Sequence, residues 1–239
     1  MSVKEKLVLA LDVSEEKYAL ELVDRFKDHV EVFKVGFELF VSAGPAVVNG
    51  INRRGKKVFL DLKFHDIPNT VEKAARAATR LGIYMFNIHT SGGAGMMRRC
   101  RDAVEELCIK ENMRKPIILG VTVLTGLSPE ALKSELCIRH SLKTHVKHLS
   151  GLAKEAGLDG VVASGHEVAM IREHFGKDFI IVAPGIRTSW TPPDDQMRTM
   201  TPRQAIKEGA DYIVLGRAVL KQADPFRALE LITTEILTA

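Results

Sequence analysis

Short apolar runs recur along the chain, and each has about the length of a β-strand. Most of their residues are apolar instead of alternating with polar ones, which is typical of strands buried on both faces of a parallel sheet. The pattern therefore predicts eight parallel strands that are covered on both sides. Their residue ranges are 7–11, 30–36, 57–62, 85–89, 116–123, 159–164, 179–185 and 212–216.

Helical spacing of apolar residues marks the segments between these runs. Pro68 suits the first turn of a helix, and Asp224 with Pro225 predicts the cap and first turn of the last helix. The longest segment, 124–158, has room for a short extra helix. The inner face of the helix after Pro68 is predicted to carry Val71, Ala74, Ala75, Ala78 and Leu81.

Eight alternations of strand and helix within 239 residues favour a closed (β/α)8 barrel, the TIM barrel. An open, doubly wound sheet is the alternative. No low-complexity linker or shift in composition divides the chain, so we expect residues 1–239 to form a single α/β domain. A barrel of this kind typically needs about 250 residues, which leaves no length for a second domain.

Polar residues gather where the predicted strands end. In such barrels the chemistry lies at the C-terminal strand ends and in the loops that follow them. A purely structural barrel does not need many polar groups at this rim, so we interpret them as a functional site. The residues found there are Asp12, Lys34, Asp61, Lys63, His89, Thr122, Thr125, Ser164, Arg187, Gly216 and Arg217.

The third strand carries the most unusual pattern, DLKFHD at 61–66. Strand alternation places Asp61 and Lys63 on the face that points into the barrel mouth, with Lys34 as a neighbour. Asp66 can then close a chain of alternating charges in which no charge is buried without an opposite partner. A lysine fixed between carboxylates can donate a proton. The alternatives are a salt-bridge network that only seals the barrel and, because His65 precedes Asp66, a metal site.

The last two strands end in two glycine–arginine combinations, Gly185 with Arg187 and Gly216 with Arg217. Loops after strands seven and eight are the usual phosphate seat of this fold. We therefore predict a phosphate site there, because glycine lets the backbone approach an oxyanion and arginine binds it with two hydrogen bonds. The long loop 187–201 is predicted to be a lid from which Gln196 reaches the substrate; the alternative is an ordinary surface loop.

Composition and charge narrow the class of protein. The chain is 46% hydrophobic and 27% charged, with a net charge of +4 dispersed along its length. This excess is too small to indicate a nucleic-acid partner, although it suits attraction of an anionic small molecule. The three cysteines form no CxxC pair and indicate free thiols in a reducing compartment. The first residues predict neither a signal peptide nor a membrane span, so we expect a cytoplasmic protein.

Taken together, these motifs resemble those of the bacterial orotidine 5′-phosphate decarboxylases, in the same order and over nearly the whole chain. The segment DxKxxDIPNT is the most specific of them, and the phosphate motifs corroborate it. One departure is Gly126, which stands where the family has a serine in an LTS motif. The matching motifs are LALD at 9–12, KVG at 34–36, DLKFHDIPNTV at 61–71, VTVLTG at 121–126, APGIR at 183–187, DDQMR at 194–198 and VLGRAV at 214–219.

The resemblance implies an enzyme that removes carbon dioxide from orotidine 5′-phosphate without a cofactor or metal. By this resemblance, Lys63 protonates C6 of the pyrimidine and Asp61 faces the substrate carboxylate. Asp66 and Thr70 reach into the site of a neighbouring subunit, which implies a homodimer. The remaining matches are contacts to the substrate: Asp12 and Lys34 for the ribose, Thr125 for the pyrimidine, and Arg187, Gln196, Gly216 and Arg217 for the lid and the phosphate.

Three other functions remain as alternatives. A metal-dependent sugar-phosphate decarboxylase or hexulose phosphate synthase of a related barrel family shares the D-x-K-x-x-D strand end, although the IPNT continuation and the loop 187–201 argue against it. A catalytically silent protein that binds nucleotide phosphates is disfavoured by the intact chain of charges. An RNA-binding role has only the small positive charge in its favour.

Overall fold

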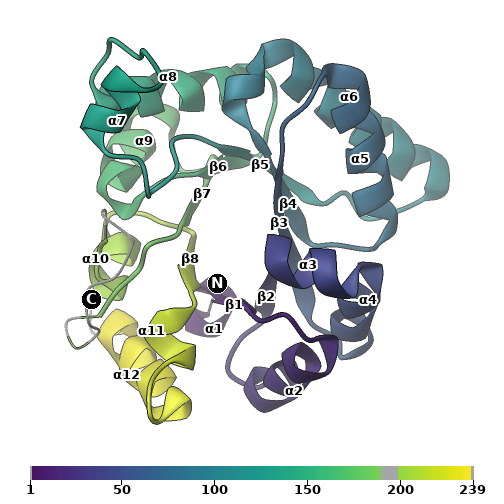
Figure 1. The fold of residues 1–239 in the computed structure, drawn as a ribbon, viewed down its shortest axis with the longest axis vertical. Coiled ribbons are helices and arrows are strands. Elements are labelled where there is room, and N and C mark those ends of the chain that lie inside the picture. The colour runs from purple at the N-terminus through teal and green to yellow at the C-terminus, as the bar shows by residue number, and fades with distance from the viewer. Residues whose placement is uncertain (1, 189, 191–198, 238–239) are drawn as a thin grey trace.

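The computed structural model of the protein describes residues 2–188, 190 and 199–237. Within these ranges, eight parallel strands follow one another in chain order and close into a barrel, around which the helices form a ring (Figure 1). The predicted single-domain (β/α)8 barrel is therefore confirmed, and an open sheet is excluded. The strands are β1 Leu7–Ala10, β2 Val32–Val35, β3 Lys57–Phe64, β4 Met85–His89, β5 Ile117–Val121, β6 Gly160–Val162, β7 Ile180–Ala183 and β8 Tyr212–Leu215.

The helices lie between the strands, as the spacing of apolar residues predicts. In chain order they are α1 Val3–Lys6, α2 Glu16–Phe26, α3 Phe37–Ala43, α4 Pro45–Arg53, α5 Pro68–Arg80, α6 Gly93–Glu111, α7 Pro129–Ser134, α8 Leu142–Glu155, α9 Val168–Phe175, α10 Pro202–Lys207, α11 Arg217–Leu220 and α12 Pro225–Leu237. Two single 3-10 turns, η1 Thr90–Gly92 and η2 Gly165–Glu167, follow β4 and β6. Within the described residues, none of the helices is long and apolar enough to cross a membrane.

The strands are apolar on both faces because two separate hydrophobic layers cover them. One layer lies between the strands and the helical ring, and residues such as Leu9, Phe33 and Phe86 are fully buried there. The other layer fills the barrel interior. Burying a side chain such as Phe59, which is 1% exposed, contributes about 1.5–3 kcal/mol. The interior layer consists of Val8, Val32, Phe59, Met85, Leu119, Val182 and Tyr212.

The N-terminal end of the barrel is closed by two tyrosines. The hydroxyl groups of Tyr84 and Tyr212 are 2.7 Å apart, and burial, followed by this hydrogen bond, raises the pKa of Tyr212. The ammonium of Lys57 lies 4.7 Å from the centre of the Tyr84 ring, and the guanidinium of Arg114 lies 5.3 Å from it. These contacts fill the end of the barrel opposite the strand carboxyl ends, which are the usual place of the chemistry in this fold.

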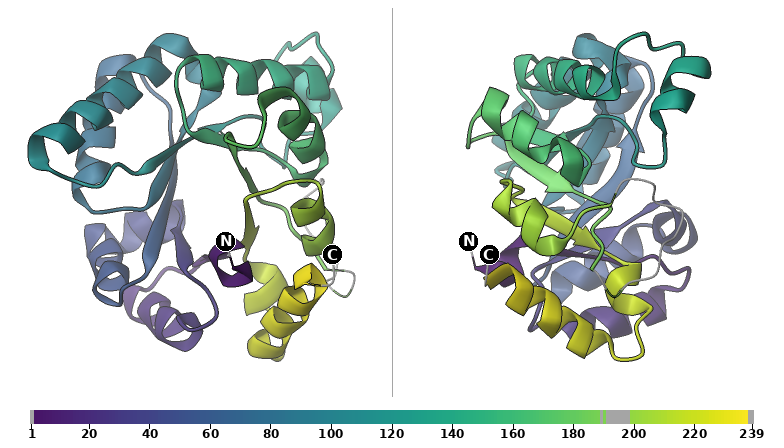
Figure 2. Two further views of the ribbon diagram at one scale, coloured as in Figure 1. Left: turned by 180° about the vertical axis from the view of Figure 1, so that it is seen from behind. Right: turned by 90° about the vertical axis from the view of Figure 1, so that its left-hand side faces the viewer.

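Three predicted helix features are confirmed. Pro68 is the first residue of α5, where its missing N–H leaves no intrahelical hydrogen bond unmade. The carboxylate of Asp224 caps α12 by accepting a hydrogen bond of 3.0 Å from the backbone N–H of Arg227. The extra helix in 124–158 is α7, which Ser128 caps. In the side view of Figure 2, α7 stands out from the ring on the side opposite the N-terminus.

Candidate active site

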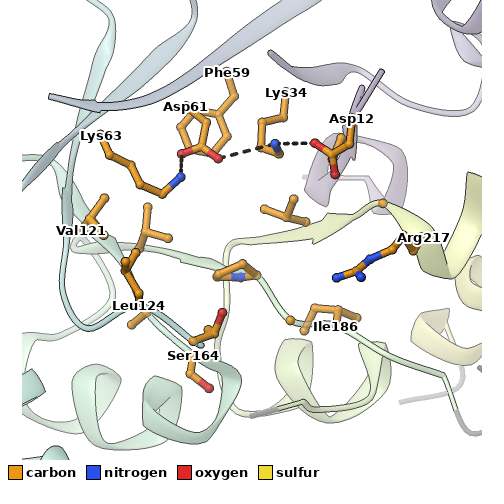
Figure 3. Close-up of a pocket in the computed structure, with 18 of the residues that line it drawn as sticks. Asp12, Lys34, Phe59, Asp61, Lys63, Val121, Leu124, Ser164, Ile186 and Arg217 are labelled. Atoms are coloured by element: carbon orange, nitrogen blue, oxygen red, sulfur yellow. Dashed lines mark hydrogen bonds and ion pairs between the residues drawn. The ribbon is translucent and has the colours of Figure 1, made fainter. Parts of the chain in front are cut away.

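A cavity of about 220 Å³ opens at the C-terminal ends of the strands. Charged groups follow one of its walls, and apolar side chains such as Val121, Leu124 and Ile186 face them (Figure 3). Nearly all the polar rim residues expected from the sequence meet here. The lining residues are Ala10, Asp12, Lys34, Phe59, Asp61, Lys63, Val121, Val123, Leu124, Thr125, Val162, Ala163, Ser164, Pro184, Gly185, Ile186, Arg187, Val214, Gly216 and Arg217.

Four charged side chains form a row of alternating sign along this wall (Figure 3). The Nζ atom of Lys63 lies 2.7 Å from Oδ1 of Asp61. The Nζ atom of Lys34 lies 3.5 Å from Oδ2 of Asp61 and 3.0 Å from Oδ1 of Asp12. The side chains of Lys34 and Asp61 are only 11% and 14% exposed. Each of these poorly hydrated charges has an opposite partner, which offsets the cost of removing it from water.

The carboxyl group of Asp61 is held in its ionised form. Burial alone raises its pKa, but the positive charges of Lys34 and Lys63 lower it, as do the hydrogen bonds from Lys63 and Asn87. The net result is a pKa below the ordinary value of an aspartate. The cavity wall therefore holds a fixed negative charge between two lysine side chains.

Strand β3 places these groups through its period of two, as the sequence predicts. Phe59, Asp61 and Lys63 all face the cavity. The pairing of β3 with β4, however, shifts register between Leu60 and Phe64, and Lys63 has a φ of 42°. A residue other than glycine in this left-handed region costs of order 1–3 kcal/mol, and such strain is concentrated at functional sites. Period-two reasoning gives the correct face but does not reveal this irregularity.

Asn87 of β4 is a residue of the site that the sequence analysis missed. Its side chain is completely buried, and it lies behind the cavity wall. Its Nδ2 group donates to Oδ1 of Asp61 at 2.7 Å, and its Oδ1 accepts from the backbone N–H of Lys63 at 2.8 Å. A signal was available in the sequence, because an asparagine inside the apolar run MFNIH requires buried hydrogen-bond partners.

The predicted phosphate residues lie together on the other side of the cavity. Arg217 follows β8 and points toward the middle of the cavity (Figure 3), beside Gly216. Gly185 has a φ of 76°, which favours glycine, and the turn that it makes delivers Arg187 to the lining. The backbone N–H of Arg187 donates to the carbonyl of Met200 at 2.9 Å. This bond ties the beginning of the predicted lid, 187–201, to its end.

Among the described residues, two predicted site residues do not line the cavity. Asp66, which precedes α5, and Thr70, in its first turn, are both exposed. The Asp66 carboxylate accepts a 2.6 Å hydrogen bond from the backbone N–H of Ile67. Among the described residues Asp66 forms no ion pair with Lys63, so within one chain it does not close the row of charges. Gln196, predicted to act from the lid, lies outside the described residues.

Two further rim residues have other surroundings. The ring of His89 packs against that of His65, with centroids 5.2 Å apart. Burial lowers the pKa of His89, and the neighbouring His65 and Lys63 lower it further, against the opposing effect of the Asp61 carboxylate. Thr122 is buried, and its hydroxyl donates to the carbonyl of Val162 at 3.0 Å. In the part of the chain that the structure describes, no three His, Cys, Asp or Glu side chains are grouped so that they could hold a metal ion.

Comparison with known proteins places this chain in a family. Residues 5–232 match the model of the orotidine 5′-phosphate decarboxylase / HUMPS family. The chain belongs to this family. The orotidine 5′-phosphate decarboxylase of Moorella thermoacetica is 47% identical over 99% of this chain and 94% of its own length. That of Trichlorobacter lovleyi is 48% identical over 98% of this chain and 96% of its own length.

Solved structures of similar proteins agree with this placement. The crystal structure of orotidine 5′-phosphate decarboxylase from Lactobacillus acidophilus has a TM-score of 0.84 to this chain and is 35% identical, covering 97% of this chain and 99% of its own. An uncharacterized conserved protein from Geobacillus kaustophilus has a TM-score of 0.83 at 36% identity and covers 96% and 99%. The resemblance seen in the sequence motifs is thus confirmed for the family and the fold.

Proposed function

We propose that this chain is an orotidine 5′-phosphate decarboxylase of pyrimidine biosynthesis, which converts orotidine 5′-phosphate into uridine 5′-monophosphate (UMP). The family and the relatives of that name support the reaction. The structural observation that carries the assignment of roles is the row of charges. The ammonium of Lys63 lies 2.7 Å from the Asp61 carboxylate at the wall of a cavity, next to Lys34.

The proposed chemistry uses the charge of Lys63 twice. When carbon dioxide leaves, the electron pair of the broken carbon–carbon bond stays on C6 of the pyrimidine as a carbanion. A positive ammonium fixed near C6 stabilises that charge, because it needs no reorganisation when the charge develops. Lys63 then transfers a proton to C6, which gives UMP, and takes a proton from water to become an ammonium again. Asp61 holds the ammonium in place and faces the departing carboxylate.

The other site residues bind parts of the substrate away from C6. Lys34 and Asp12 contact the ribose, and Thr125 contacts the pyrimidine. Arg187, Gly216 and Arg217 bind the phosphate, and Gln196 reaches the substrate from the lid. Those of them that the structure describes all line one cavity, which supports these roles. Binding energy from the remote phosphate can then be used to order the reacting groups around C6.

The proposal includes a homodimer in which Asp66 and Thr70 complete the site of the neighbouring subunit. Two observations support it. The Asp66 carboxylate makes no ion pair with Lys63 within the described part of its own chain. Ile67, which lies between Asp66 and Thr70, is a large apolar residue that is 66% exposed. We further propose that residues 1–239 form one domain and that the enzyme acts in the cytoplasm.

The experiment that tests the reaction is ultraviolet absorbance with orotidine 5′-phosphate in buffer that contains excess chelator. A steady fall in the absorbance of the orotate chromophore, with UMP as the product, is expected. No change in the presence of an active control enzyme would reject the proposal. The assay would then be repeated with magnesium and sugar phosphates, to test the related metal-dependent activities.

A further inference from the structure

The buried amide of Asn87 has no role in the mechanism above, yet it is bonded to both residues at the centre of that mechanism. Its Nδ2 group donates to Oδ1 of Asp61 at 2.7 Å, and its Oδ1 accepts from the backbone N–H of Lys63 at 2.8 Å. The residue is 0% exposed and does not line the cavity. It therefore cannot contact a substrate and can act only through its two partners.

The chemistry of these two partners fixes the orientation of the amide. A backbone N–H can only donate a hydrogen bond, and an ionised carboxylate can only accept one. The Asn87 oxygen must therefore face Lys63, and its nitrogen must face Asp61. A side chain that has one acceptor and two donors in the same plane suits this pair of neighbours, whereas aspartate lacks the donor and leucine lacks both groups.

The contact to Lys63 lies where the sheet itself is interrupted. The register between β3 and β4 shifts between Leu60 and Phe64, and Lys63 has a φ of 42° within that interval. Lys63 has no register partner in the pairing of β3 with β2 or β4, and its N–H donates to the side chain of Asn87. The side chain thus takes the place of a sheet hydrogen bond and holds a backbone conformation that is unfavourable by itself.

We propose that Asn87 is a positioning residue that fixes the Asp61 carboxylate and the Lys63 backbone in one arrangement, so that the Lys63 ammonium is directed at the reacting atom. This inference rests on the proposed decarboxylation. It means that a residue of β4 supports the reacting groups, although within the described residues no β4 side chain lines the cavity. Asn87 makes no contact with the substrate, so its substitution acts on turnover and on the ionisation of Asp61, and leaves phosphate binding intact.

The surroundings of Asp61 determine what a substitution at Asn87 does to the pH profile. Its carboxylate is faced by Lys34 from β2, Lys63 from β3 and Asn87 from β4. Asp12 shares Lys34 with it, and the imidazole of His89 lies within range of its charge. The hydrogen bond from Asn87 favours the ionised form, so its removal raises the pKa of Asp61. The acidic limb of the rate profile then moves to higher pH.

The test uses two variants at this position and one control variant. Asn87→Leu removes both hydrogen bonds and keeps the branched shape of the side chain. Asn87→Asp keeps the acceptor for Lys63 but places a second carboxyl group against Asp61. The control is Asn52→Leu on α4, where the lost amide donates to the backbone carbonyl of Leu81 at 2.8 Å, away from the cavity. For each protein, kcat, KM, the pH profile, UMP affinity and the melting temperature are measured.

We expect both Asn87 variants to lose roughly 10- to 100-fold in kcat, with KM and UMP affinity close to native. The acidic limb of their profiles moves to higher pH, more so for Asn87→Asp because two adjacent carboxyl groups cannot both ionise freely. The control loses stability but keeps native kcat and a native profile. If Asn87→Leu does not fold, Asn87→Asp decides the question.

Two results would overturn the inference. The first is a folded Asn87 variant with native kcat and a native pH profile. The second is a variant whose UMP affinity falls as much as its kcat, which would show a general collapse of the site. Failure of the proposed function would be distinguishable from both, because the unmodified enzyme itself would then fail to decarboxylate orotidine 5′-phosphate in the same assay.

Discussion

Replacement of Lys63 separates its chemical role from its structural one. Lys63→Ala removes the ammonium that, in our proposal, stabilises and protonates C6, so we expect turnover to fall by at least roughly 10³-fold. The side of the cavity proposed to bind phosphate, with Arg187 and Arg217, is untouched, so we expect UMP affinity to be largely retained. Substantial residual decarboxylation by Lys63→Ala would reject the role of Lys63 as the proton donor.

The effect of this change on stability follows from the contacts that remain. Removing a hydrogen bond between charged groups lowers the unfolding free energy by about 1.5–3 kcal/mol. Asp61 keeps its hydrogen bond from Asn87 at 2.7 Å and its ion pair with Lys34 at 3.5 Å, and Lys63 itself is 25% exposed. Because Asp61 is not left as a buried charge without a partner, we expect Lys63→Ala to lose only about 1–2 kcal/mol of unfolding free energy.

The φ of 42° at Lys63 adds a second, more specific expectation. At an ordinary strand position, a protein with alanine is more stable than the same protein with glycine by about 0.5–1 kcal/mol. In the left-handed region, however, a side chain costs about 1–2 kcal/mol that glycine does not incur. The difference predicts that Lys63→Gly is more stable than Lys63→Ala by roughly 0.5–1 kcal/mol, although both variants are inactive.

Urea unfolding followed by circular dichroism measures this order. The control pair is Lys57→Ala and Lys57→Gly, at the beginning of the same strand, where φ is not positive. There the alanine variant is expected to be the more stable. Lys63→Gly could instead be less stable than Lys63→Ala, by the same margin as in the control pair. That result would refute the claim that the backbone at Lys63 is strained, and with it the reason given for the Asn87 contact.

Three further predictions concern the dimer, the lysine row and pH. Mixing Lys63→Ala with Asp66→Ala chains should restore roughly a quarter of native activity after subunit exchange. Half of the dimers are then hybrids, and each hybrid has one complete site out of two. No recovery after demonstrated exchange counts against the shared site. Gly36→Ala should lower kcat while changing the unfolding free energy only slightly, because its Cβ would lie 3.0 Å from Nζ of Lys34 and displace that flexible group. An unchanged kcat would refute this prediction. Because folding lowers the pKa of His89, the unfolded chain binds this proton more tightly than the folded one, so stability falls as pH drops through 6.5. His89→Gln should reduce the loss in melting temperature between pH 7 and 5. An unchanged loss would contradict this prediction.

Much of the fold follows from local patterns, because most residues of each strand are apolar. The side of β3 that carries Asp61 and Lys63 follows from the period of two along a strand. Helix starts such as Pro68 follow from local hydrogen-bonding rules. These features depend on neighbours in the sequence, so a single chain without a structure is enough to predict them.

The structural features that the sequence patterns did not predict depend on contacts between segments that are distant in the chain. The left-handed backbone of Lys63 arises from the irregular pairing of β3 with β4, which no local pattern encodes. The role that we propose for Asn87 exists only because folding brings it to Asp61. The surroundings of Asp66 in a complete site depend, in our proposal, on a second subunit. Sequence patterns thus indicate which charged groups line the cavity better than they indicate what holds those groups in place.

The central claim is that an ammonium at position 63 drives the reaction, and its restoration tests that claim directly. Lys63→Cys, prepared with Cys137→Ser because Cys137 is exposed, is treated with 2-bromoethylamine, which builds a lysine-like ammonium on the new thiol. We expect Lys63→Cys to be inactive and the treated protein to regain decarboxylation, while the Cys137→Ser protein with its native Lys63 does not change. Full modification shown by mass spectrometry without any recovery of activity would contradict the account.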